Sequence, residues 1–212
     1  MIPKKIVLTS AYLAPIEFYS KLYSYENVCI EQYDHYVKQT YRNRCVIAAP
    51  GGPLTLTIPV SLNTTGKTPM RDVRISDHGK WRHLHWMALV SAYENSPYFE
   101  FYADDFRPFY EKRYDFLFDF NNELQVKICE LIGIQPMIEH TFEYMEQGLE
   151  GVDDYREIIH PKRDSAENTN FFPKEYYQVF GHRHGFLPNM SIVDLLFNMG
   201  PESLLILRDS VK

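Results

Sequence analysis

The sequence predicts an α/β domain with a central mixed sheet, flanking helices and a C-terminal helical extension. Short apolar runs of strand length occur early in the chain and are followed by polar turns. Between Lys80 and Gly133, apolar residues instead recur at helical spacing. We expect residues 1–150 to form the core domain. Residues 151–212 should pack on it, because so short a segment cannot build an independent core.

The first elements are a strand, a tight turn and a helix. Ile6–Thr9 is apolar and β-branched, which favours a buried strand. Pro15 suits the first turn of a helix, and Phe18 and Leu22 then recur on one face. Val28–Ile30 predicts a second strand. Because ligands bind beyond the carboxyl ends of strands in such sheets, the segments after these two strands are expected to be neighbours.

A β-hairpin is predicted next. Its strands are Cys45–Ala48 and Leu54–Val60, and the second alternates with a period of two. Pro50–Pro53 (PGGP) is typical of the turn between them. Val73–Ile75 and Met137–Tyr144 predict two further strands.

Three helices are predicted in the middle of the chain. One runs from Lys80 to Tyr93 with Asp77 as its cap. Tyr98–Tyr110 is expected to be helical in pieces, and Tyr114–Gly133 is a long amphipathic helix that ends at a glycine. After residue 151, short helices are expected at Val152–Ile159, Ile192–Phe197 and Glu202–Leu207.

Composition excludes several classes of function. The net charge is −6 and no long basic run exists, so nucleic acid is not an expected partner. The three cysteines lack CxxC spacing, which argues against a disulfide framework and a structural zinc site. The N-terminal residues lack a signal-peptide pattern and no apolar run is long enough to span a membrane, so we expect a cytoplasmic protein. Walker, GxGxxG, GxSxG and HExxH motifs are absent, so several common enzyme classes lack their usual signature, and the cofactor is left unassigned.

The segment Glu31–Arg44 (EQYDHYVKQTYRNR) combines charges and tyrosines at a density unusual for a buried element. We interpret it as the edge of a cleft that binds a polar, anionic ligand. Arg42 and Arg44 would share one face of a strand, and their guanidinium groups suit phosphate or carboxylate. A salt-bridged surface strand is the alternative. The residues expected to bind the ligand are Tyr12, Lys38, Tyr41, Arg42, Asn43, Arg44 and Trp81.

Two histidines are candidates for a catalytic base. His85 lies one helical turn after Trp81 in the run WRHLHW, and His35 lies beside Asp34. His83 and His85 are two apart on a helix and cannot chelate one metal ion together. The spacing around His35 matches no metal-binding loop, so no metal site is predicted. Packed structural histidines are the alternative for both candidates.

Several motifs together resemble the WbqC-like family of bacterial proteins, and the resemblance covers nearly the whole chain. The C-terminal motifs resemble the form common in Bacteroidetes. The motifs are Ala11–Tyr19 (AYLAPIEFY), Tyr36–Arg44 (YVKQTYRNR), Leu56–Val60 (LTIPV), Trp81–His85 (WRHLH), Ser91–Phe99 (SAYENSPYF), Tyr177–Phe180 (YQVF) and Gly185–Pro201 (GFLPNMSIVDLLFNMGP).

The resemblance implies a role in the synthesis of O-antigen and other surface polysaccharides. We therefore expect an enzyme that acts on an activated or amino sugar, with acyl or aminoacyl transfer as the reaction. Its ligand would be a sugar or nucleotide-sugar. Lys38, Arg42 and Arg44 would hold phosphate, and His85 or His35 would be the base.

Two alternatives belong to other functional classes. A nucleotidyltransferase would cradle a nucleotide in the first strand, turn and helix. A non-catalytic binding or scaffold protein of a polysaccharide assembly complex would instead use the aromatic segment Phe171–Met199 as its partner surface.

Overall fold

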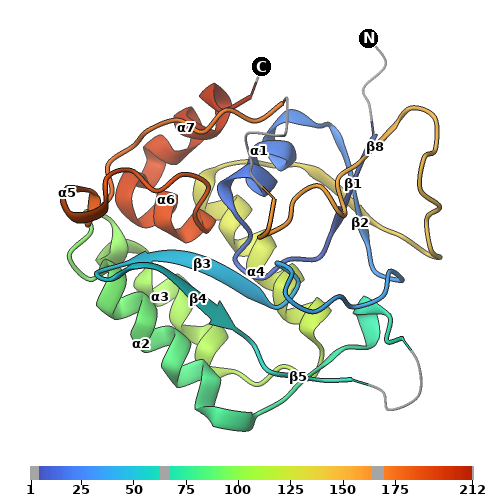
Figure 1. Cartoon of the computed structure of the whole chain (residues 1–212), viewed down its shortest axis with the longest axis horizontal. Coiled ribbons are helices and arrows are strands. Elements are labelled where there is room, and N and C mark those ends of the chain that lie inside the picture. The colour runs from blue at the N-terminus through green and yellow to red at the C-terminus, as the bar shows by residue number, and fades with distance from the viewer. Residues whose placement is uncertain (1–4, 63–66, 164–169, 212) are drawn as a thin grey trace.

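The α/β class predicted from the sequence is confirmed by the structure, a computed structural model that describes residues 5–62, 67–163 and 170–211 (Figure 1). A four-stranded sheet lies at one side of the molecule. A long hairpin and most of the helices occupy the other side. Within the described ranges, no helix is long and apolar enough to cross a membrane.

The chain alternates strands and helices over most of its length. The strands are β1 (Lys5–Thr9), β2 (Asn27–Glu31), β3 (Arg44–Ala49), β4 (Gly52–Thr57), β5 (Val60–Ser61), β6 (Arg74–Ile75), β7 (Met137–His140) and β8 (Val152–Asp154). The α-helices are α1 (Ile16–Ser24), α2 (Trp81–Tyr93), α3 (Phe99–Glu111), α4 (Leu117–Ile132), α5 (Gly181–His184), α6 (Ile192–Met199) and α7 (Ser203–Asp209). Short 3-10 helices are η1 (Met70–Asp72), η2 (His78–Lys80) and η4 (Gly200–Glu202).

The main sheet has the strand order β7-β2-β1-β8, and every neighbouring pair is parallel. The antiparallel pairs form two separate small sheets, β3–β4 and β5–β6. The β3–β4 pair is the hairpin that the PGGP turn predicts. Because the four main strands are parallel, their carboxyl ends meet at one edge of the sheet.

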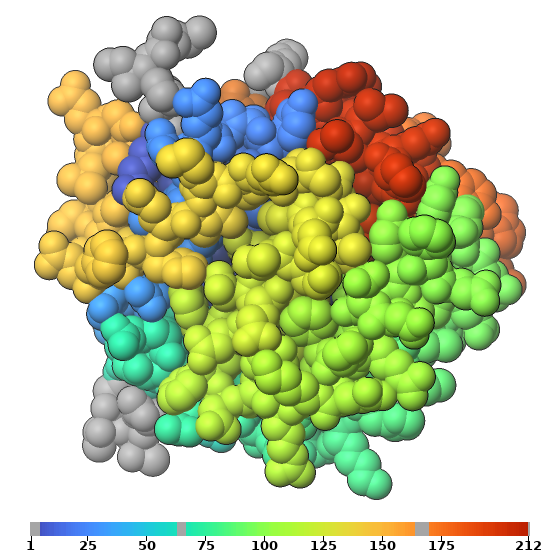
Figure 2. Space-filling model, turned by 180° about the vertical axis from the view of Figure 1, so that it is seen from behind, coloured from blue at the N-terminus to red at the C-terminus, as the bar shows by residue number. Residues whose placement is uncertain are grey.

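The two faces of the main sheet are covered differently. Ile6, Leu8, Val28 and Ile30 point to one face and belong to the main hydrophobic core. Cys29 points to the other face and is also buried, but lies outside that core cluster. Strands β7 and β8 are the two outer strands of the sheet. The connection between them therefore crosses this second face. In the space-filling view from behind, the gold residues of this region lie beside the blue β1 and β2 (Figure 2).

The prediction for helix α4 is confirmed, whereas the prediction for helix α3 is not. Helix α4 ends at Gly133, whose φ of 84° places it in the left-handed region, and the N–H groups of Gly133 and Ile134 donate to the Cys129 carbonyl. Helix α3 is continuous, so the prediction of separate helical pieces was wrong. Its aromatic residues explain this, because Phe99, Tyr102, Phe106 and Tyr110 form one buried stripe.

Two other local predictions were also wrong. Val152–Asp154 is strand β8 and not a helix, because it pairs with the otherwise open edge of β1. Asp77 does not cap α2. Its carboxylate accepts a hydrogen bond from Arg82 at 2.5 Å, and η2 precedes the helix instead.

The C-terminal helices pack on the rest of the fold. Helices α6 and α7 contact α1, and α6 also contacts α2, α3 and β3. Asp194 of α6 is fully buried and accepts hydrogen bonds from the hydroxyl groups of Tyr93 and Tyr176. Gly200 follows α6 with a φ of +53°, and a Cβ atom there would lie 2.5 Å from the Tyr98 ring.

Candidate functional site

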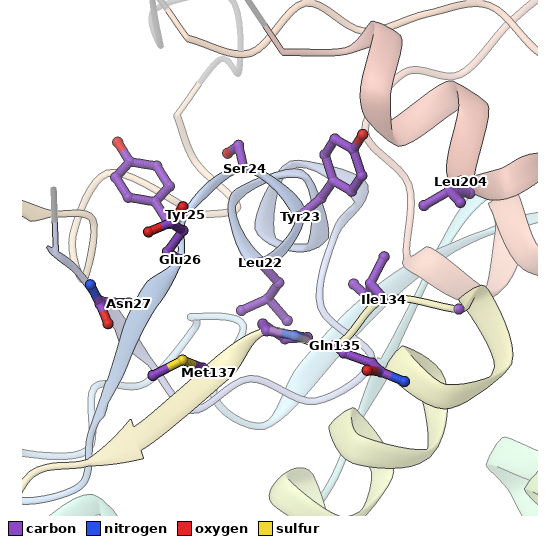
Figure 3. Close-up of a pocket in the computed structure, with 12 residues that line it drawn as sticks. Leu22, Tyr23, Ser24, Tyr25, Glu26, Asn27, Ile134, Gln135, Met137 and Leu204 are labelled. Atoms are coloured by element: carbon purple, nitrogen blue, oxygen red, sulfur yellow. The ribbon is translucent and has the colours of Figure 1, made fainter. Parts of the chain in front are cut away.

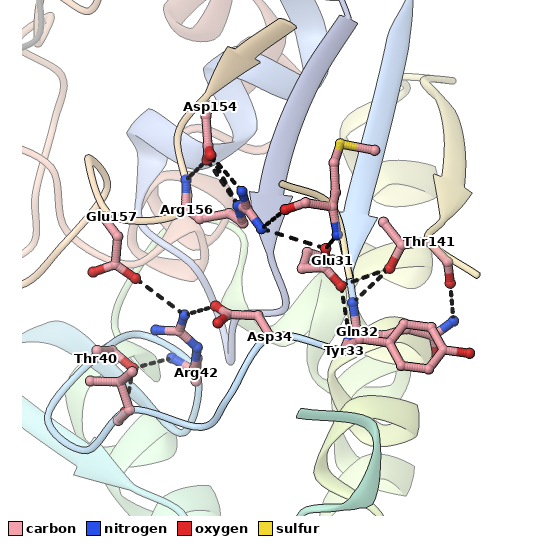
Figure 4. A network of polar contacts seen from close by, with 12 residues as sticks. Glu31, Gln32, Tyr33, Asp34, Thr40, Arg42, Thr141, Asp154, Arg156 and Glu157 are labelled. Atoms are coloured by element: carbon pink, nitrogen blue, oxygen red, sulfur yellow. Dashed lines mark hydrogen bonds and ion pairs between the residues drawn. The ribbon is translucent and has the colours of Figure 1, made fainter. Parts of the chain in front are cut away.

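The candidate site lies at the carboxyl edge of the main sheet, where ligands bind in α/β proteins (Figure 4). Two buried guanidinium groups and four carboxylates meet there. Their side chains come from the ends of β2 and β8 and from the segments that follow these strands. The charged residues are Glu31, Asp34, Arg42, Asp154, Arg156 and Glu157.

Glu31 is the centre of one half of this network. Its side chain has no exposed surface. The carboxylate accepts hydrogen bonds from the Tyr33 N–H (2.7 Å), the Thr141 hydroxyl (2.8 Å) and the Met145 N–H (2.8 Å). Arg156 Nη1 lies 3.5 Å from it. Glu31 therefore attaches the crossing segment between β7 and β8 to the end of β2.

Arg156 connects Glu31 to β8. Its Nε and Nη2 donate to the two carboxylate oxygens of Asp154 at 3.0 and 2.6 Å, and Nη1 donates to the Met145 carbonyl at 2.9 Å. The guanidinium also lies over the Tyr144 ring, 5.4 Å from its centre. Burial alone would raise the pKa of Asp154, but the hydrogen bonds and charge of Arg156 lower that pKa below its usual value.

Arg42 forms the other half of the network. Its side chain is 1% exposed, and Nη2 contacts Asp34 at 2.5 Å and Glu157 at 3.5 Å. The Arg42 carbonyl accepts a hydrogen bond from Asn121, which also donates to the Ser10 hydroxyl. Among the described residues, Arg42 Nε and Asn121 Oδ1 are buried without a partner. Arg42 is thus held by carboxylates inside the protein and does not present a free fork to phosphate.

A pocket of about 430 Å³ opens between the second face of the sheet and the crossing segment. Lys5, Cys29 and Glu139 line it from the sheet. Thr141 and Met145, which both bond Glu31, line it from the crossing segment. The pocket therefore shares its wall with the buried charge network, and its volume is within the range of small-molecule sites.

Comparison with known protein families gives a match that includes this part of the chain. A model described as the WbqC-like protein family matches residues 10–160. The chain belongs to the WbqC-like protein family. All six charged residues of the network lie within the matched range, whereas α6 and α7 lie outside it.

One relative of this WbqC-like chain is the uncharacterized protein Rv1507c of Mycobacterium tuberculosis (strain ATCC 25618 / H37Rv). It is 26% identical over 225 residues, which covers 94% of this chain and 96% of that protein. No solved structure matches. The Bacteroidetes-type form of the family stays a prediction.

Three of the residues predicted from the sequence to act in a site, Tyr12, Trp81 and His85, lie together in the core. The ring of Tyr12 stacks on His85, and its hydroxyl lies 2.9 Å from both His85 Nδ1 and the Tyr110 hydroxyl. Trp81 packs edge-on against His85. Burial lowers the pKa of His85 from 6.5 to about 4, and burial raises the pKa of Tyr12 well above its usual value. His85 is 5% exposed, so its imidazole has almost no surface with which to contact a substrate directly.

The remaining predicted residues are spread along the segment that leads into β3. His35 and Lys38 are exposed, and Tyr41 is partly buried. Asn43 is buried and donates to the Ile58 carbonyl at 2.8 Å. Arg44 begins β3, whereas Arg42 precedes it, so the prediction that the two arginines share a strand face was wrong.

Sequence reasoning missed the partners of Glu31 and Arg42. Asp154, Arg156 and Glu157 lie in the run GVDDYRE, for which a helix is predicted from the sequence. The signal that could have found them is a strand at Val152, because charged residues just after a parallel strand lie at the edge where ligands bind. Across residues 5–62, 67–163 and 170–211, no three His, Cys, Asp or Glu side chains form a group suited to a metal ion.

A larger pocket, of about 610 Å³, lies at the opposite, amino edge of the sheet (Figure 3). The end of α1 and the residues after α1 and α4 line it, together with Leu204 of α7. Glu26 is the one charged residue in this lining. The carboxyl edge is the better candidate site, because it brings charged groups together next to a smaller pocket.

Proposed function

We propose that this protein is an enzyme of bacterial surface-polysaccharide biosynthesis that acts on an amino sugar, and that an acyl or aminoacyl group is transferred to the sugar amine. Membership of the WbqC-like family supports the biosynthetic role. The observation that carries the choice of substrate is the acidic pocket between the second face of the sheet and the crossing segment.

The lining of this pocket suits a cationic sugar. Three carboxylates, from Glu139, Glu143 and Glu146, line the pocket with one ammonium group, from Lys5, which pairs with Glu139. A protonated sugar amine would gain charge-assisted hydrogen bonds there. The rings of Phe142 and Tyr144 add apolar surface of the kind that packs against a sugar ring. A phosphate group would be repelled by the same lining.

The proposed reaction joins the amine to an activated acyl donor, such as a thioester. The amine nitrogen forms a bond to the acyl carbon, and the bond between that carbon and the leaving group breaks. The leaving group departs with the bonding electron pair. The two protons that the ammonium group loses pass to a pocket carboxylate and to the leaving group. His35, the exposed one of the two histidines predicted as the base, follows β2 but is not part of this lining, so a pocket carboxylate is the better candidate for the base.

The other functional classes have less support. Phe171, Tyr176 and Phe197 are buried in the protein's own core, which weighs against the segment Phe171–Met199 as a partner surface.

We place the reaction in the cytoplasm, because Cys29, Cys45 and Cys129 are free thiols, as is usual in reducing compartments.

Calorimetric titration with glucosamine and N-acetylglucosamine tests the proposal. N-acetylglucosamine lacks the positive charge and is expected to bind at least tenfold more weakly. Each of the substitutions Glu139→Gln and Glu146→Gln should weaken glucosamine binding about fivefold, which corresponds to about 1 kcal/mol for a partly exposed charge pair.

Glu130→Gln is the matched control. Glu130 is 66% exposed and paired with Lys127, and Glu139 is 69% exposed and paired with Lys5. Equal binding of the two sugars, or an equal effect of the control, would contradict recognition of an amine in this pocket. Transfer of a radiolabelled acetyl group from a thioester to glucosamine then tests the reaction itself.

A further inference from the structure

We propose that the outer face of the WRHLHW run, together with the end of α3, binds a nucleoside phosphate. A pocket of about 510 Å³ lies between the beginning of α2 and the last turns of α3. The lining residues that carry the argument are Lys80, Arg82, His83, Trp86, Arg107 and Tyr110. This pocket is separate from the amino-sugar pocket and does not depend on it, because the two share no lining residue.

The charges at the beginning of α2 are the reverse of the usual arrangement. The partial positive charge of a helix N-terminus normally attracts acidic side chains. Helix α2 has no acidic residue in its first turn and no side-chain cap, and Lys80, Arg82 and His83 lie there instead. Lys80 also has a φ of 52°, which costs free energy in a residue with a side chain. An anionic ligand would stabilise this concentration of positive charge.

Neighbouring carboxylates neutralise this charge only in part. Arg82 pairs with Asp77, and Arg107 pairs with Glu111 at 2.7 Å. Among the described residues, Lys80 has no ion pair. Within a protein of net charge −6, three cations and a histidine therefore surround one pocket whose lining holds a single carboxylate, Glu111. Phosphate oxygens fit such a set of donors.

Two aromatic rings form the apolar wall of the pocket. Trp86 is half-buried and packs against Tyr110, with ring centres 5.8 Å apart and an angle of 34° between the rings. Trp86 also packs against Phe99, at 6.0 Å. The Tyr110 hydroxyl is held by Tyr12 inside the core. A fixed indole beside cationic side chains suits a ligand that combines a planar base with phosphate groups.

Tryptophan fluorescence tests this site directly, because the protein has only two tryptophans and Trp81 is buried. ADP and UDP are the probes, and pyrophosphate and uridine represent the separate halves of the ligand. We expect both nucleotides to quench the fluorescence with dissociation constants below about 1 mM. Trp86→Phe should remove the quenching but leave binding measurable by calorimetry. Pyrophosphate should compete with ADP for the site. Uridine alone should bind at least tenfold more weakly than UDP.

Charge variants locate the site. Lys80→Gln and Arg107→Gln should each weaken ADP binding about tenfold. Arg208→Gln is the matched control, because Arg208 is 56% exposed and paired with Asp209, and Arg107 is 60% exposed and paired with Glu111. The proposal is overturned if neither nucleotide binds at about 5 mM, or if the lysine and arginine variants bind as tightly as the control. Glu139→Gln should leave nucleotide binding unchanged, so this test and the glucosamine test can fail independently.

Discussion

The buried histidine of α2 should make the protein lose stability in mild acid. Burial lowers the pKa of His85 from 6.5 to about 4, although a backbone hydrogen bond with Thr57 partly opposes this change. In the unfolded chain the same imidazole titrates near pH 6.5. Between these two values the unfolded chain binds a proton that the native protein does not. The free energy of unfolding therefore falls as the pH falls through this window.

The size of the effect follows from the two pKa values. Their difference, from 6.5 to about 4, corresponds to about 3 kcal/mol, and about 2.5 kcal/mol of this is lost by pH 4.5. Urea unfolding at pH 7.5 and pH 4.5 measures it. His85→Gln has no imidazole to protonate, so it should lose about 2.5 kcal/mol less than the wild type between these pH values.

His83→Gln is the matched control, because His83 lies on the same helix and is exposed. It should retain the pH dependence of the wild type. The reasoning is refuted if His85→Gln loses as much stability as the wild type between pH 7.5 and pH 4.5. That outcome would mean that protonation of His85 is tolerated in the native core.

Three further substitutions test the packing and the charge network. Arg156→Met leaves the buried carboxylate of Glu31 without its guanidinium and should lower the free energy of unfolding by about 3–5 kcal/mol in urea. A loss below about 1 kcal/mol would show that the backbone donors suffice. Gly200→Ala forces a Cβ atom into an aromatic ring and should cost about 3 kcal/mol in a thermal melt. Gly148→Ala, at a similar φ but with no atom within 4 Å, should cost about 1 kcal/mol, and equal losses would contradict the steric reason. Asp194→Ala leaves several buried donors unpaired and should cost about 3 kcal/mol, with faster proteolysis of the C-terminal helices. Unchanged cleavage would count against its role as their anchor.

Elements defined by local pattern were predictable from the sequence. Strands β1 and β2 are short apolar runs, and the β3–β4 hairpin is marked by its glycine-proline turn. Helix α4 has a long amphipathic repeat and a C-terminal glycine. In each case the residues that determine the element lie within the element or beside it. Strand β8 is different, because its few residues become a strand only by pairing with β1, far away in the sequence.

The same limit applies to the candidate site. The prediction of a strand at Val28–Ile30 correctly placed the segment 31–44 beyond the carboxyl end of that strand, and its density of charge suggested a cleft. It did not indicate which charges are buried, because burial depends on partners elsewhere in the chain. Arg42 is paired with Glu157, and Glu31 is paired with Arg156. Both members of each pair are present in the sequence, but they are more than 100 residues apart, and no local pattern shows that they are in contact.

The burial of Arg42 changes where an anion would bind. A guanidinium that is 1% exposed and already shared by two carboxylates gains little from phosphate, because the phosphate would first have to displace those carboxylates. The cations at the beginning of α2 have the opposite character, since they are accessible from a pocket and lie where the helix dipole is also positive. The sequence predicted phosphate at Arg42 and a base at His85. We propose instead that phosphate binds on the outer face of the run that contains His85, and that a cationic sugar binds beside Glu31 and Arg156.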